Sequence, residues 1–332
     1  MVRTAQKSMV ANGGGSEDRC MRIGVIGLGW VGASVAVSTL HRGIARELWL
    51  NDVREGLAEA EAADLAHGAS FYPRCDVRAA TVEQMAQHCD AIVIAAGKGA
   101  LPGRSRLDAL SITATIARQV GTALRGTQAV VVVVTNPVDV MTQLVAESSG
   151  LPTERVLGTG TMLDTARLRH ELSARIGIDQ RSIHANVLGE HGDSQVVAWS
   201  SASAGGRPLR DWPGLPPADE PTIAESVRRA AYRIIDKKGA TNHAIGLVTA
   251  SLLQSLLRDE HRLLTVSCLH RGGDAAHLLG DEPVALSLPM VVGRSGAVRL
   301  VMPPLDAAER AALRRSADCL RAARASVASD GT

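Results

Sequence analysis

The feature that most constrains the fold is a short apolar segment followed at once by a glycine-rich turn. Residues 21–26 have the composition of a buried strand, and residues 33–40 suit a helix. Glycines between them let the backbone turn sharply and approach a pyrophosphate, while the first turn of the helix offers unpaired N–H groups. We therefore expect this turn to bind a dinucleotide through Gly27, Leu28, Gly29, Val31 and Gly32.

A second apolar segment, residues 47–52, ends in an acid. This residue, Asp52, stands 20 positions after Gly32. An acid at this place accepts both hydroxyls of the adenine ribose of NAD and repels the additional phosphate of NADP. The sequence therefore predicts NAD as the cofactor.

Strand-like and helix-like segments alternate through the first half of the chain. A helical stretch near residues 53–67 is followed by a strand at 90–95, a helix at about 107–124 and a very apolar strand at 129–134. This alternation predicts an α/β fold, a Rossmann-type doubly wound parallel sheet that binds its ligands at the carboxyl ends of the strands. The loops that contain Ala96-Gly97 and Asn136 would then face the cofactor.

The pattern changes after Leu151-Pro152 into mixed helices and strands. Residues 200–222, with Gly205-Gly206 and five prolines, are the clearest loop. We expect a flexible arm at 1–20, an NAD-binding Rossmann domain at 21–150, a mixed α+β substrate domain at 151–325 and a tail at 326–332.

The composition agrees with an enzyme and is ordinary for a chain that buries a sizeable core. The chain has 332 residues, 45% of them apolar, and a net charge of +2, which predicts no affinity for nucleic acid or membrane. Its five cysteines are widely spaced and never form C-x-x-C, so we expect reduced, buried thiols and no metal site. Residues 1–20 lack the apolar core of a signal peptide, and we expect a cytoplasmic protein.

Two further strings together indicate acid/base chemistry. One is Gly189-Glu190-His191-Gly192-Asp193-Ser194, and the other is Leu163-Asp164-Thr165-Ala166-Arg167. An imidazole held by a carboxylate exchanges a proton near neutral pH, and an arginine beside it grips a substrate carboxylate through two parallel hydrogen bonds. A lone histidine in a glycine-rich stretch is more often a solvated or capping residue. Behind a nucleotide-binding turn, the two strings favour an acid/base site for a carboxylate substrate.

With these motifs, the chain resembles the L-lactate/malate dehydrogenase family from about Met21 to about Ala323. Residues 189–193 and 287–296 are most similar to bacterial L-lactate dehydrogenases. The other matching strings are residues 27–32, Asp52, 64–68, 96–97, 102–108, 135–139, 158–164 and 238–241.

The resemblance implies an NAD-dependent L-2-hydroxy acid dehydrogenase and a role for each matching residue. His191 would donate and accept the proton, Asp164 would stabilise its imidazolium form, and Arg167 would bind the substrate carboxylate. Arg106 would polarise the 2-oxo group, and residues 98–110 would close over the bound substrate. Within the same pocket, Asn136 would hydrogen-bond near the nicotinamide ribose and the substrate oxygen, and Thr241 would line the wall.

One departure from the family concerns the substrate side chain. The position that reads it falls on Ala100, where lactate dehydrogenases usually carry glutamine and malate dehydrogenases carry arginine. A small residue leaves volume for a longer apolar group than methyl. Two alternatives stay open, namely pyruvate itself and an anionic side chain attracted by Arg104 or Lys98.

The resemblance also implies a homo-oligomer, either a tetramer or a dimer. Bacterial relatives activated by fructose 1,6-bisphosphate bind its phosphates with an arginine and a histidine, and Arg169 and His184 occupy the matching places. Two ordinary surface cations are the other interpretation.

Two other functional classes also stay open. One is an NAD-dependent glycosidase of related fold, which needs a metal bound by cysteine and histidine. The other is a nucleotide-binding protein without catalysis, against which the intact His191, Asp164, Arg167 and Arg106 argue.

Overall fold

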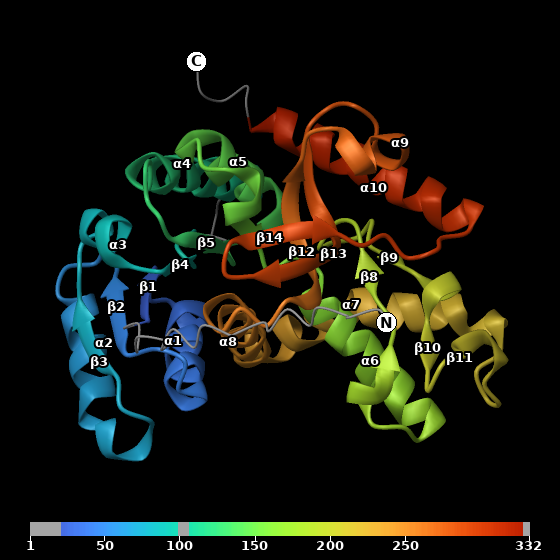
Figure 1. Cartoon of the computed structure of the whole chain (residues 1–332), viewed down its shortest axis with the longest axis horizontal. Coiled ribbons are helices and arrows are strands. Elements are labelled where there is room, and N and C mark those ends of the chain that lie inside the picture. The colour runs from blue at the N-terminus through green and yellow to red at the C-terminus, as the bar shows by residue number, and fades with distance from the viewer. Residues whose placement is uncertain (1–20, 99–105, 328–332) are drawn as a thin grey trace, which may run out of the picture.

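The computed structural model describes residues 21–98 and 106–327 (Figure 1). The expected arm at 1–20, Ala100, Arg104 and the end of the tail, residues 328–332, lie outside these ranges, and the side chain of Arg106 is not described. The predicted two-domain division stays a prediction.

One large sheet runs through both halves of the chain. Its parallel part has the strand order β3-β2-β1-β4-β5-β6, and three antiparallel strands, β12, β13 and β14, continue it beyond β6. This order confirms the Rossmann-type fold, whose direction of winding changes between β1 and β4. The strands are β1 (Arg22–Ile26), β2 (Glu47–Asn51), β3 (Asp76–Ala79), β4 (Ala91–Ile94), β5 (Val130–Val133), β6 (Val156–Gly158), β12 (Arg262–His270), β13 (Val284–Gly293) and β14 (Gly296–Leu300).

Helices cover both faces of the sheet. In β4, Ile92 and Ile94 pack into one hydrophobic cluster and Ala91 and Val93 into another, because successive side chains of a strand point to opposite faces. Figure 1 shows α4, α5 and α10 on one side and α1 and α8 on the other. The helices are α1 (Trp30–Arg42), α2 (Leu57–His67), α3 (Val82–His88), α4 (Arg106–Ala123), α5 (Val138–Ser149), α6 (Met162–Ile176), α7 (Glu220–Lys238), α8 (His243–Leu257), α9 (Ala276–Leu279) and α10 (Ala307–Ser326).

Short strands build the rest of the second half around a third cluster that includes Leu168, Leu172 and Ile223. They are β7 (Ile183–His184), β8 (Val187–Leu188), β9 (Val196–Val197), β10 (Ser203–Ala204) and β11 (Arg207–Pro208). The predicted loop at 200–222 was therefore wrong in part. It contains the pair β10–β11, and its last three residues already belong to α7.

Two further expectations need correction. The sequence reasoning missed β3 and α3, since the alternation of charged and small residues in β3 gives no apolar run. Cys75, Cys89 and Cys268 are buried free thiols as expected, but Cys319 is exposed on α10.

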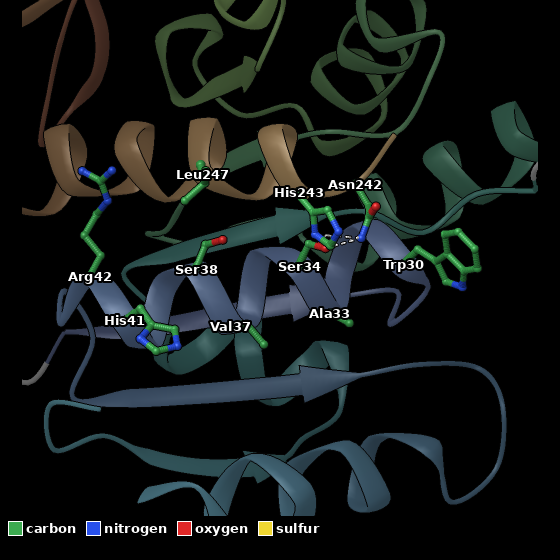
Figure 2. A pocket seen from close by; sticks show the side chains of 10 residues that line it. All are labelled: Trp30, Ala33, Ser34, Val37, Ser38, His41, Arg42, Asn242, His243 and Leu247. Carbon is green, nitrogen blue, oxygen red and sulfur yellow. Dashed lines mark hydrogen bonds between the residues drawn. The ribbon is translucent and has the colours of Figure 1, made fainter. Parts of the chain in front are cut away.

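The helix α8, from the second half of the chain, packs against the nucleotide-binding half. A Cβ atom on Gly246 would lie 2.6 Å from the backbone oxygen of Ser34, so only glycine permits this approach of α8 to α1. Asn242 donates a hydrogen bond of 2.9 Å to the Ser34 hydroxyl (Figure 2). This contact holds Asn242, the residue directly after Thr241, against α1. No helix among the described residues is long and apolar enough to cross a membrane.

Candidate active site

The glycine-rich turn lies at the carboxyl end of β1 and leads into α1. A Cβ on Gly27 would lie 2.5 Å from the Cα of Ala96, and one on Gly32 would lie 1.8 Å from the Gly27 oxygen. Around Gly29, in contrast, nothing lies within 4 Å of the Cβ position. The turn is therefore tightly packed against the protein at Gly27 and Gly32 and open at Gly29, as a binding site for a pyrophosphate must be.

The acid predicted to bind the ribose stands at the end of β2. Asp52 accepts a hydrogen bond of 2.7 Å from the Leu28 N–H, which ties it to the turn. The Arg54 guanidinium also bonds to it, and this contact, stronger than the opposing effect of burial, lowers the pKa of Asp52 to about 2. The turn therefore has an ionised carboxylate beside it, at the place where the adenine ribose of a dinucleotide is expected.

The structure brings His191 and Asp164 together, although they belong to separate segments. Asp164, in the first turn of α6, is 3% exposed, and its Oδ2 lies 2.5 Å from the His191 Nδ1. Burial is the largest single effect and by itself would lower the pKa of His191, but the charge and hydrogen bond of Asp164, together with the charge of Asp139, raise this pKa above its usual value. His191 therefore keeps its proton below this raised pKa and loses it as the pH rises through it.

Arg167 lies one helical turn beyond Asp164, on the same face of α6. Its Nη1 donates a hydrogen bond of 2.7 Å to Asp164 Oδ1, and its side chain is 15% exposed. Burial raises the pKa of Asp164, but His191 and Arg167 more than offset this and lower it. Within the described residues this is the one hydrogen bond found for Arg167, so the rest of its guanidinium is available to a carboxylate.

A second carboxylate, Asp139 near the start of α5, holds the backbone of His191. Its Oδ2 accepts the His191 N–H at 2.8 Å, and the residue is 2% exposed. Burial raises the pKa of Asp139 to about 6, against the opposing effects of the Ser267 hydroxyl and of His191. The charge of Asp139 also helps to raise the pKa of His191. Sequence reasoning assigned Asp139 no role, because the valines on either side of it show burial but not its partner.

The loop that carries His191 is fixed at both of its ends. Gly189 exchanges two backbone hydrogen bonds of 2.9 Å with Ser287 of β13. The N–H of Glu190 donates to the Ser316 hydroxyl of α10 at 2.8 Å, and the Glu190 carboxylate accepts from Ser194 N–H at 3.0 Å. Nothing near Ser316 in the sequence pointed to this role, since it lies 126 positions from Glu190.

The other predicted site residues that the structure describes lie in loops or at the start of a helix, and the two proposed effector residues lie near β7. Ala96 and Gly97 follow β4, and Asn136 is exposed after β5, so both loops open at the same edge of the sheet. Thr241 lies between α7 and α8, and Arg106 begins α4. Arg169 and His184 lie elsewhere, near β7: the Arg169 guanidinium bonds to the Ala185 oxygen at 3.0 Å, and His184 is exposed. No metal-binding group of three or more His, Cys, Asp or Glu occurs in the described ranges.

Two family models together match almost the whole described chain. The lactate/malate dehydrogenase NAD binding domain matches residues 21–158, and the lactate/malate dehydrogenase alpha/beta C-terminal domain matches residues 161–329. The chain belongs to the lactate/malate dehydrogenase family. It is accordingly an NAD-dependent oxidoreductase that acts on the CH–OH group of 2-hydroxy acids.

Individual relatives support this family assignment along most of their length. The chain is 42% identical to an L-lactate dehydrogenase of Thermus aquaticus, covering 91% of this chain and 98% of the relative. It is 38% identical to an L-lactate dehydrogenase of Bifidobacterium animalis subsp. lactis, covering 90% and 95%. The solved minor L-lactate dehydrogenase of Enterococcus mundtii superposes with a TM-score of 0.87 at 36% identity, covering 92% and 98%.

We expect Asp139→Asn to lower the pKa of His191 in this dehydrogenase. The amide still accepts the His191 N–H but removes a negative charge that favours the imidazolium form. NMR titration of histidine-labelled protein, with His191 assigned through His191→Gln, measures the change.

The matched control for this titration is Asp179→Asn, the same substitution at an exposed carboxylate. It should leave the His191 titration unchanged. An unchanged or higher pKa in Asp139→Asn would show that Asp139 does not act on the imidazole.

Proposed function

We propose that this chain is an NAD-dependent L-2-hydroxy acid dehydrogenase in which His191 is the acid/base, and that its substrates carry a side chain larger than methyl. The observation that supports the acid/base role is the 2.5 Å contact between His191 and the buried Asp164, with Arg167 on the same carboxylate. A cytoplasmic location belongs to the same proposal, and fractionation of expressing cells tests it.

In this proposal the proton moves through the free nitrogen of His191. Nδ1 is held by Asp164, so Nε2 exchanges a proton with the oxygen on C2 of the substrate. Bound NADH supplies the hydride that adds to C2. During reduction His191 gives up its proton, and during oxidation it takes one. Asp164 stabilises the charged form, and Asp139 keeps the loop in place.

Substrate orientation depends on the arginines. Arg167 binds the carboxylate on C1 as a planar fork, for which it has donors besides the one on Asp164. Arg106, at the start of α4, stabilises the negative charge that develops on the C2 oxygen. Asn136 and Thr241 complete the pocket from the loops after β5 and before α8.

Replacing His191 by glutamine should slow turnover by about 2 to 4 powers of ten, because proton transfer is lost. Binding of NADH should stay nearly intact. Arg167→Lys should chiefly raise KM, since an ammonium group cannot form the planar fork. Steady-state kinetics and calorimetric NADH binding measure both effects.

For the kinetics, His277→Gln serves as the control, because His277 is exposed on α9. If His191→Gln turned over at nearly the wild-type rate, His191 would not be the acid/base.

The proposed preference for larger side chains rests on Ala100. Loss of the family glutamine leaves space at the position that reads the substrate side chain, and burial of one or two additional methylenes contributes about 1 to 3 kcal/mol. The main alternative, pyruvate, is supported by the relatives, which are named L-lactate dehydrogenases. An anionic side chain attracted by Arg104 or Lys98 is the remaining candidate.

A panel of 2-oxo acids distinguishes these substrates by the absorbance of NADH. We expect kcat/KM to rise by about tenfold from pyruvate to branched or aromatic 2-oxo acids, and Ala100→Gln to reverse that order by filling the space. A wide preference for pyruvate in the wild type would refute the proposal of a larger side chain. A wild-type preference for oxaloacetate that is lost in Arg104→Ala would favour the anionic alternative.

We also propose that the chain assembles with itself, as a tetramer or a dimer. Support comes from apolar side chains along α1 and α8, where Trp30 is 61% exposed and Leu247 58% exposed. They line a groove of about 990 Å³ between the two helices (Figure 2). Clustered exposed apolar side chains of this kind are typical of interfaces.

Light scattering should give about four times, or at least twice, the 34.8 kDa of one chain. Trp30→Glu should lower this mass, whereas Val53→Glu, at a 99% exposed position outside the groove, should not. A monomeric wild type would contradict self-assembly.

Fructose 1,6-bisphosphate remains a proposed effector at Arg169 and His184, because Arg169 on α6 bonds to the oxygen of Ala185, the residue that follows His184. An activity curve unchanged by millimolar sugar bisphosphate would refute this regulation alone.

A further inference from the structure

The carboxylate that is expected to meet the adenine ribose is already fully bonded by protein groups. Asp52 Oδ1 accepts from the backbone N–H of Arg54 at 3.0 Å and from its Nε at 2.9 Å. Asp52 Oδ2 accepts from the Leu28 N–H at 2.7 Å and from Arg54 Nη2 at 3.1 Å. An ionised carboxylate offers about four lone-pair positions, and these four donors use them.

Arg54 therefore competes with the ribose for Asp52. Two hydroxyl groups can bond to the carboxylate only where the Arg54 side chain gives up its positions. While Arg54 stays, its charge also neutralises that of Asp52, so the repulsion that would exclude a 2′-phosphate is weakened.

The place of Arg54 suits it to bind a phosphate. Its side chain is 60% exposed over a carboxylate that is only 7% exposed, so Arg54 covers the outer side of Asp52. Its Nη2 also donates to the Leu28 oxygen at 3.2 Å, which keeps the guanidinium at the glycine-rich turn. A guanidinium matches phosphate oxygens in a bidentate geometry and stays charged at any working pH.

We propose that Arg54 is a second determinant of cofactor choice, which leaves Asp52 to the ribose and binds the 2′-phosphate of NADPH, so that this enzyme accepts NADPH beside NADH. Asp52 alone predicts exclusion of NADP, and Arg54 makes that exclusion incomplete. The inference rests on the proposed function only in placing the ribose at Asp52.

The chain contains a matched control for this arrangement. At Asp179 and Arg181 the same two-residue spacing forms the same contacts, with Arg181 Nε at 3.0 Å from Asp179 Oδ1 and Nη2 at 3.0 Å from Oδ2. That pair is exposed and follows the carboxyl end of α6, whereas the glycine-rich turn lies between β1 and α1. Arg181→Ala therefore removes an equivalent ion pair without touching the nucleotide site.

Calorimetric titration with NADH and with NADPH, without substrate, tests the proposal. In the wild type we expect NADPH to bind within about 100-fold of NADH, and Arg54→Ala to weaken NADPH by about tenfold or more while NADH binds equally or more tightly. Arg181→Ala should change neither affinity. Raising the salt concentration should weaken NADPH more than NADH in the wild type, and this difference should shrink in Arg54→Ala.

A second variant, Asp52→Ser, keeps Arg54 and removes the carboxylate that competes with a 2′-phosphate for the Arg54 guanidinium. It should shift the ratio of affinities further toward NADPH. A ratio in Arg54→Ala within about twofold of the wild type would overturn the proposal, and so would a wild type that binds NADH but no NADPH. A protein that binds NADH but reduces no 2-oxo acid would instead refute the proposed function. The role of Arg54 in cofactor choice would still be decided by the binding titrations.

Discussion

The contact between the His191 imidazole and the buried carboxylate of Asp164 is the interaction on which the rest of the site depends. Taking two ionisable groups out of water is costly, and their attraction offsets that cost only when both are present and well placed. Here the geometry comes from elements far apart in the sequence. The helix α6 supplies Asp164, while α5, β13 and α10 hold the loop with His191 through Asp139, Ser287 and Ser316.

The parallel sheet explains why the glycine-rich turn and the pair of His191 and Asp164 lie at the same edge. Strands β1, β2, β4 and β5 all end at one edge, and so the glycine-rich turn, Asp52 and the loops at Ala96 and Asn136 meet there. The chain leaves β6 at the same edge to enter α6, which brings Asp164 and Arg167 to it. The approach of α8 to α1 at Gly246 then brings Asn242, the residue after Thr241, against α1.

The fold and the site could be predicted from the sequence where the responsible residues form a short, continuous motif. Strands β4 and β5 were predictable because a strand buried on both faces needs a continuous run of apolar residues. The turn before α1 was predictable because its close packing needs glycines. The pairing of His191 with Asp164 followed from two short strings. Asp139 and Ser316 could not be found this way, since their contacts to the loop span 52 and 126 positions. Arg54 also gave no signal, because one arginine near an acid is common at the surface.

The central proposal is that Asp164 sets the proton affinity of His191 and thereby how the rates of reduction and of oxidation change with pH. The most direct measurement is the pH dependence of kcat/KM for reduction and for oxidation, in the wild type and in Asp164→Asn. For the wild type, reduction should fall and oxidation rise through a pKa above the ordinary histidine value of about 6.5. In Asp164→Asn both changes should move to lower pH. Identical profiles in the two proteins would contradict the account.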